Sequence, residues 1–280
     1  MRLISRIIIT IILTQTALNA IGTQFLSIPT TTYELIFGVN PISQNAIYSP
    51  VLSASYGNWL GEIKVSSFGY HRNMFGGTTG INLRYVALND LELRLDRPTA
   101  EPLSVFNANA IAVDGSYLRQ LKIGLLGTKI RYISIQLFNE TANGFAIDLS
   151  LNRQINDKLK VGIALLNFGN MSELYEEKPK LPIRTVIGSS YKFHFNNIDN
   201  SLFVAIEKSS IVNGVIFRIG NVASLNKIQI LVGSQFSQKT VAVSGGIGIK
   251  LGAYRVGYGI QFGTQSLGIP QLFDISVTLP

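Results

Sequence analysis

Side chains that act as acids, bases or metal ligands are few and widely separated in this chain. It has two histidines, His71 and His194, and no cysteine. A metal site needs several ligands at short, regular spacing, and neither histidine has a partner at such a spacing. The lack of cysteine also removes disulfide bonds, thiolate metal sites and a cysteine nucleophile. We therefore expect no metal and no cofactor.

Asp114 and Asp148 are the candidates for a pair of carboxylates that transfers protons. No Gly-x-Ser-x-Gly elbow, phosphate-binding glycine loop or His-Glu-x-x-His helix accompanies them. Ordinary ion pairs with Arg119 or Arg131 explain these carboxylates better than catalysis does, because no nucleophile is at hand. The sequence predicts a protein that is not an enzyme.

The composition is hydrophobic, but the sequence lacks the long apolar runs of helical membrane proteins. Hydrophobic residues make up 46% of the 280 residues and charged residues 14%. No run of about 18 apolar residues follows the N-terminus. The net charge of +8 is scattered along the chain, whereas nucleic-acid-binding proteins cluster such charge on one face. We expect no nucleic-acid partner.

Apolar residues instead alternate with polar or small ones, which is the period of a β-strand. In the segment 253–263 one parity is apolar, and its members are Tyr254, Val256, Tyr258, Ile260 and Phe262. A coarse reading finds about 14 such strands. They cover 52–60, 62–72, 76–89, 104–121, 122–139, 142–153, 158–168, 182–195, 199–208, 213–221, 226–235, 239–250, 253–263 and 270–279.

The first twenty residues resemble an export signal. Arg2 and Arg6 precede an apolar stretch at 7–13, and Ala20 provides a small residue at a cleavage point. An uncleaved N-terminal helix is the alternative. Alternating strands behind an export signal predict an all-β protein, a transmembrane antiparallel β-barrel in contact with the lipid of the bacterial outer membrane. A soluble β-sandwich is the rival fold, although the low charge content disfavours it.

Residues 21–51 are rich in proline and do not alternate, so we expect them to lie outside the barrel wall of residues 52–280. They form either a periplasmic extension or a plug inside the lumen. Glycines on the inward parity, such as Gly246 and Gly259, indicate that something packs closely inside. The candidate lumen charges are Asp114, Arg119, Asp148, Lys250, Arg255 and Asp274.

Two longer breaks, at 96–102 and 171–182, predict surface loops. The second is too charged for hydrocarbon and offers a surface for a partner protein. Its candidate docking residues are Glu173, Tyr175, Glu176, Glu177, Lys178 and Lys180.

Several short sequence motifs, and the order in which they occur, resemble the PorV/PorQ family of outer-membrane barrels. This family is related in fold to the FadL-type transporters. The motifs are Gln-Phe-Leu-Ser-Ile-Pro at 24–29, Gly38, 45–50, Gly-Ser-Tyr-Leu-Arg at 115–119, Gly-Phe-Ala-Ile-Asp at 144–148, 159–169, Leu181-Pro182 and 188–191, with a weaker match near Gly268. Ser49-Pro50-Val51 stands where the family has Asn-Pro-Ala.

The resemblance implies a fourteen-stranded barrel with an N-terminal hatch. Its candidate hatch residues are Phe25, Leu26, Ile28, Pro29, Gly38, Asn45 and Pro50. It implies a non-catalytic component or docking protein of the type IX secretion system, with secretion components or cargo sorting domains as partners. The FadL relationship implies the alternative, passive transport of hydrophobic small molecules. A purely structural barrel is a third reading. The cargo or ligand and the oligomeric state stay open.

Overall fold

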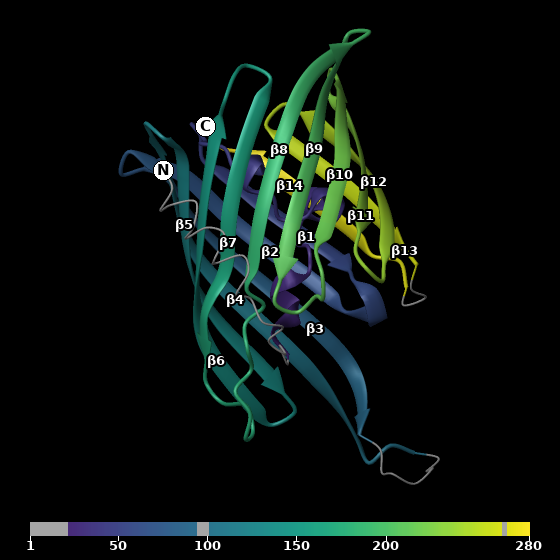
Figure 1. Cartoon of the computed structure of the whole chain (residues 1–280). Helices are drawn as coiled ribbons and strands as arrows, with labels where there is room; N and C mark the ends of the chain where they lie inside the picture. The colour runs from purple at the N-terminus through teal and green to yellow at the C-terminus, as the bar shows by residue number, and fades with distance from the viewer. Residues whose placement is uncertain (1–21, 94–100, 265–267) are drawn as a thin grey trace.

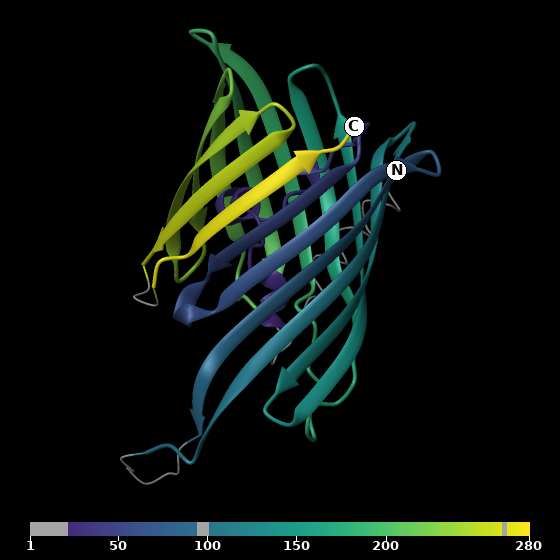
Figure 2. The same ribbon diagram turned by 180° about the vertical axis from the view of Figure 1, so that it is seen from behind.

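The computed structural model describes residues 22–93, 101–264 and 268–280, so the predicted signal peptide lies outside the described residues. Fourteen antiparallel strands follow one another around a closed barrel, and β14 pairs with β1 to complete the wall (Figures 1 and 2). The predicted closed barrel is confirmed. A β-sandwich is excluded, because every strand has two hydrogen-bonded neighbours in one continuous sheet.

The strands lie close to their predicted positions. They are β1 (Val51–Asn58), β2 (Lys64–Met74), β3 (Gly77–Leu93), β4 (Ser104–Leu121), β5 (Gly124–Leu137), β6 (Glu140–Gln154), β7 (Leu159–Met171), β8 (Arg184–Phe195), β9 (Ile198–Ser209), β10 (Ile216–Leu225), β11 (Ile228–Phe236), β12 (Val241–Leu251), β13 (Tyr254–Gly263) and β14 (Gln271–Thr278).

Alternation of side chains sets which residues face outward. In β6 exposed and buried residues follow one another with period two, and Phe145 on the outer face is 63% exposed. β5 alternates poorly in sequence because Ile133 and Ile135 are apolar yet buried on the inner face. Both isoleucines belong to an apolar cluster with Phe25, which precedes the barrel in the chain.

The two ends of the barrel differ in their connections. At the end that we call the turn end, short turns follow β2, β4, β6, β8, β10 and β12, and Pro50 and Leu279 lie beside each other. At the other end, the loop end, longer connections include 172–183 and 210–215. A short helix, η3 (Leu60–Glu62), lies between β1 and β2 at the loop end.

Residues 22–45 form a segment inside the barrel that we call the plug (Figure 1). It contains η1 (Thr23–Ser27), α2 (Thr32–Phe37) and η2 (Pro41–Ser43). Thr31 caps α2 by accepting a hydrogen bond from Glu34 N at 3.1 Å, and Gly38 ends it with a φ of +70°. Within the described residues, no helix has the length and apolar character needed to span a membrane.

The plug runs from the loop end toward the turn end. Phe25 and Leu26 pack near the loop end against Val65 and Met171, whereas Ile42 packs with Phe203 further along the lumen. Aromatic rings reinforce this second contact, with 4.9 Å between the ring centroids of Phe37 and Phe203. Apolar burial therefore holds both halves of the plug.

Candidate functional site

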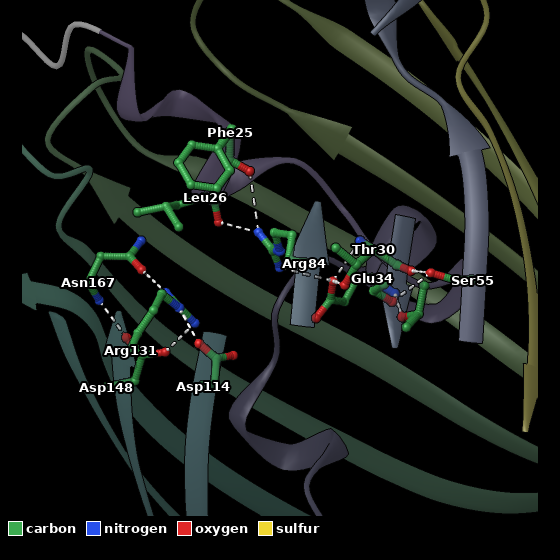
Figure 3. Close-up of polar contacts among 12 residues, drawn as sticks. Phe25, Leu26, Thr30, Glu34, Ser55, Arg84, Asp114, Arg131, Asp148 and Asn167 are labelled. Atoms are coloured by element: carbon green, nitrogen blue, oxygen red, sulfur yellow. Dashed lines mark hydrogen bonds and ion pairs between the residues drawn. The ribbon is translucent and has the colours of Figure 1, made fainter. Parts of the chain in front are cut away.

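Arg84 of β3 links the plug to the barrel wall at the centre of the lumen (Figure 3). Its Nη1 donates to the carbonyl oxygens of Leu26 at 2.9 Å and Phe25 at 3.3 Å. Its Nη2 lies 3.9 Å from Glu34 Oε2. One guanidinium therefore binds η1 and α2 together.

Glu34 is the acidic residue of the plug helix. Its Oε2 accepts hydrogen bonds from both N and Oγ1 of Thr30, each at 2.8 Å. Burial favours a higher pKa for Glu34, but the charge of Arg84 and the two Thr30 donors outweigh burial and hold the pKa below its ordinary value. Glu34 is therefore an anion at neutral pH.

A second charged cluster lies on β4, β5 and β6 (Figure 3). Arg131 contacts Asp114 Oδ1 at 2.6 Å and Asp148 Oδ2 at 3.0 Å, and it also donates to the side chain of Asn167. Asn167 has a φ of +59° at a bulge between β6 and β7, and its N donates to Asp148 Oδ1 at 2.6 Å. The cluster is buried and each carboxylate has a partner.

The end of the plug nearest the turn end is bound by β6 and β7. Asn152 donates to the carbonyl oxygens of Pro41 and Gln44, at 3.0 and 3.2 Å. Lys160 Nζ contacts Ile42 O at 2.8 Å and Asn45 Oδ1 at 3.0 Å. Together with Arg84, these contacts hold the plug through polar groups on β3, β6 and β7. We call β2–β7, which contains them beside the apolar contacts of Phe25 and Leu26, the polar wall.

On the opposite wall, the backbone of the strands lies close to the side chains of α2. Four inward glycines on β10, β11, β12 and β13 leave too little room for a side chain beside the helix; they are Gly220, Gly233, Gly246 and Gly259. A Cβ at Gly246 would lie 2.7 Å from Ile36 Cδ1. We call β10–β14 the glycine wall. The predicted close approach is found at Gly246 and Gly259, whereas Gly248 and Gly257 adjoin barrel side chains.

Asp274 of β14 adds one charged contact to the glycine wall. Its Oδ2 accepts a hydrogen bond from Thr32 N at 2.7 Å, in the first turn of α2. A carboxylate is favourable at this position, since the first N–H groups of a helix have no partner within the helix.

A buried triad of charges lies on β8, β9 and β10. Arg184 donates to both carboxylate oxygens of Glu207, at 2.7 and 2.8 Å, and Arg218 Nη1 lies 2.5 Å from Glu207 Oε2. The triad contributes two positive charges and one negative charge. It stands beside the plug, because a Cβ at Gly38 would lie 2.6 Å from Arg218 Nε.

Three of the cavities in the barrel lie against α2 of the plug. One of about 280 Å³ opens toward the loop end, one of about 320 Å³ follows the polar wall, and one of about 580 Å³ opens toward the turn end. Glu34 lines all three. The helix and its carboxylate therefore stand where spaces from the two ends of the barrel meet.

The predicted hatch residues all belong to the segment in or entering the lumen. Phe25, Leu26 and Ile28 are buried, and Pro29 lines the loop-end cavity. The others have separate positions: Gly38 contacts Arg218, Asn45 accepts from Lys160, and Pro50 O accepts from Leu279 N at the turn end.

Five of the six predicted lumen charges lie on the inward parity. Asp114, Asp148 and Asp274 have the partners described above, whereas Lys250 and Arg255 are exposed near the turn end. The prediction for Arg119 is wrong. It shares its parity with Ile111 and Val113 on the outer face of β4, so Arg131 is the partner of the two aspartates.

The six predicted docking residues of the 172–183 connection are exposed. Leu174 between them is buried, and it forms a β-bridge with Glu177. The connection therefore has a fixed apolar anchor and an exposed charged surface.

Sequence reasoning missed Glu34, Arg84 and the charged triad. For Arg84 and the triad the signal was a charge on the inward parity of an otherwise apolar strand, as for Arg218 in β10, whereas Glu34 lies in the helix α2 and carried no such signal. No group of histidines and acidic residues in the described ranges forms a metal site.

These features define a class: a closed antiparallel barrel of fourteen strands with its lumen occupied by an N-terminal plug. Solved structures share this fold. A structure named CymD monoaromatic hydrocarbon channel has a TM-score of 0.64 and 10% identity, over 94% of both chains. The Pseudomonas putida toluene transporter TodX also has a TM-score of 0.64 and 10% identity, over 90% of this chain and 98% of its own.

Neither a protein-family model nor a curated protein sequence matches the chain. At 10% identity the structural likeness shows the fold alone. The resemblance to PorV/PorQ stays a prediction.

Proposed function

We propose that the protein is an outer-membrane channel through which hydrophobic small molecules pass when the plug shifts. The main support for the proposal is the arrangement of the cavities around the plug. The plug separates a cavity at the loop end from a larger one at the turn end, and the two meet at Glu34. The contacts that close this passage are side-chain hydrogen bonds and close packing, both of which can be broken without opening the barrel.

The outer face supports the membrane location. Large apolar side chains of the outward parity are widely exposed, and Ile81, Ile130 and Phe145 are each 63% exposed. Soluble monomers rarely expose such a continuous apolar surface, whereas a barrel in lipid requires it. In outer-membrane barrels short turns face the periplasm and longer loops face outward. The loop-end cavity then faces the exterior.

The buried triad of Arg184, Glu207 and Arg218 lines part of the loop-end cavity, and the apolar part of its lining suits an apolar solute. Its apolar residues include Leu35, Val39, Trp59, Ile216, Val241 and Pro270. An apolar cavity of about 150 Å³ is large enough to bind benzene, so about 280 Å³ leaves room for a substituted ring. The shared fold with CymD and TodX favours this channel function over a secretion role.

A removable lock on the plug tests the proposal. A Cβ at Gly259 lies 3.6 Å from Thr32 Cβ, which suits a disulfide bond, and the chain has no cysteine of its own. We expect oxidised Thr32→Cys/Gly259→Cys to reduce uptake of labelled toluene to the level of cells without the protein. Reduction with dithiothreitol should restore uptake.

The two single-cysteine variants are matched controls, and oxidation should leave their uptake unchanged. Equal uptake by the oxidised and reduced double variant would show that the plug does not control passage. Absence of uptake by the unlocked protein would overturn the transport function itself.

A secretion role is the second candidate, and the 172–183 connection favours it. The exposed Tyr175 and its charged neighbours stand on a segment anchored by Leu174, which suits a docking surface. Pull-down of the tagged protein from native membranes tests this role. Recovery of secretion components that is lost in Tyr175→Ala would support it, and recovery of none would count against it.

A further inference from the structure

The cavity at the turn end carries more positive than negative charge. Lys160, Lys192 and Arg255 line it, and its carboxylates are Glu34 and Asp274. Both carboxylates already bind the plug, as described above. Lys160 is also engaged, because its ammonium contacts plug oxygens.

Lys192 and Arg255 are left without a carboxylate. Neither forms an ion pair with an acidic residue in the part of the chain that the structure describes. Arg255 lies directly opposite Lys250 across β12 and β13. Like charges opposite one another on the same face destabilise a sheet, so this pair costs stability until an anion lies nearby.

Hydrogen-bond donors surround these cations. Seven serines of the barrel line the same cavity, and they are Ser53, Ser55, Ser67, Ser190, Ser201, Ser224 and Ser276. Tyr33 of the plug lines it as well. Burial raises the pKa of Tyr33, and the nearby Arg255 offsets only part of this effect, so the phenol stays protonated and can donate.

Apolar residues complete the lining. Phe203, Val222 and Leu231 lie in the same cavity as the cations and hydroxyl groups. A ligand that satisfies both surfaces has an apolar body and an anionic group. The side chains face the lumen rather than the outer face, so the ligand is a solute that enters the barrel and not a phospholipid of the bilayer.

We infer that the turn-end cavity binds a small organic anion, with Lys192 and Arg255 as its charge partners and Tyr33 and the serines as hydrogen-bond donors. The inference deepens the proposed channel function, on which it rests for the route of the solute. It places a selective step on the periplasmic side of the plug. An apolar solute with a carboxylate would be retained there, whereas its neutral analogue would not.

Calorimetric titration of the purified full-length barrel in non-ionic detergent tests the site without any transport. The probes are benzoate and its neutral analogue benzamide. We expect benzoate to bind at least about tenfold more tightly than benzamide, and Lys192→Gln/Arg255→Gln to lose at least about tenfold in benzoate affinity, because the positive charge that attracts the carboxylate is removed from the cavity.

Arg72→Gln/Arg119→Gln is the matched control. It removes the same charge near the same end of the barrel, but from exposed residues of the outer parity, and should leave benzoate affinity unchanged. Equal losses in both double variants, equal affinity for the two probes, or no binding of benzoate would each overturn the inference. Heat-modifiable migration of each variant checks that the barrel is folded. The disulfide lock reports on the plug alone, so failure of one proposal is distinguishable from failure of the other.

Discussion

The polar wall and the glycine wall hold the same plug by different kinds of contact. On β2–β7, guanidinium, amide and ammonium groups bind plug oxygens at 2.8 to 3.3 Å. On β10–β13, Gly220, Gly233, Gly246 and Gly259 meet α2 by shape. When the plug moves, water can replace the hydrogen bonds of the polar wall. The glycines have no polar side-chain groups, so water cannot replace their contacts with the plug.

Contacts of these two kinds can close a lumen and still allow the plug to move. The polar wall fixes the position of the plug, since each hydrogen bond has a direction and a length. The glycine wall fixes how near the helix lies, since any side chain there would displace it. Each wall can be altered separately, and the expected effects differ in size.

The largest effect is expected within the polar wall, at Arg131. Arg131→Met leaves Asp114 and Asp148 buried without their main partner, although Lys129 remains 3.3 Å from Asp114. Loss of one partner of a buried ion pair costs about 3–5 kcal/mol. Urea unfolding in lipid vesicles measures this change in the free energy of unfolding. Arg119→Met on the outer face is the control, and a similar loss there would contradict the assigned network.

A smaller effect is expected on the glycine wall. Gly246→Val forces a side chain against Ile36 of the plug and against the carbonyl oxygen of Tyr258 in β13, and costs about 1–3 kcal/mol through overpacking. The plug should shift, so the conductance of the barrel in planar bilayers should rise. Gly248→Val is the control, because the nearest atom there is 3.4 Å away and belongs to the flexible side chain of Gln229. Equal conductance changes in both variants would argue against a shape-based contact.

The smallest effect concerns the pH dependence of Glu34. Its pKa is lowered in the docked plug, so its stabilising contribution is complete above the ordinary pKa of 4.5 and is lost as pH falls through the lowered value. We expect the open fraction in planar bilayers to increase as pH falls below the ordinary pKa of 4.5 and through the lowered pKa, where the docked carboxylate takes up a proton. Glu34→Gln should remove this step. Persistence of the step in Glu34→Gln would assign it to another carboxylate.

Part of the site could be predicted from the sequence. Period-two alternation predicted the wall of the lumen and placed Asp114, Asp148, Asp274, Lys250 and Arg255 on its inner face. The same reasoning failed at Arg119, which lies one residue out of phase with the inward parity of β4. It also passed over Arg84 and Glu34, because their chemistry depends on each other and they are fifty residues apart in numbering.

The barrel, its strands and the face of the side chains in cleanly alternating strands follow from the sequence alone, because alternation is a local property that each strand carries in its own residues. Which charges pair and where the plug lies became clear only in the folded structure. Asp114 meets Arg131 through the register of β4 with β5, and Arg184, Glu207 and Arg218 meet across three strands. Such contacts depend on the register between neighbouring strands, and the position of the plug depends on the barrel that encloses a segment with no alternation of its own.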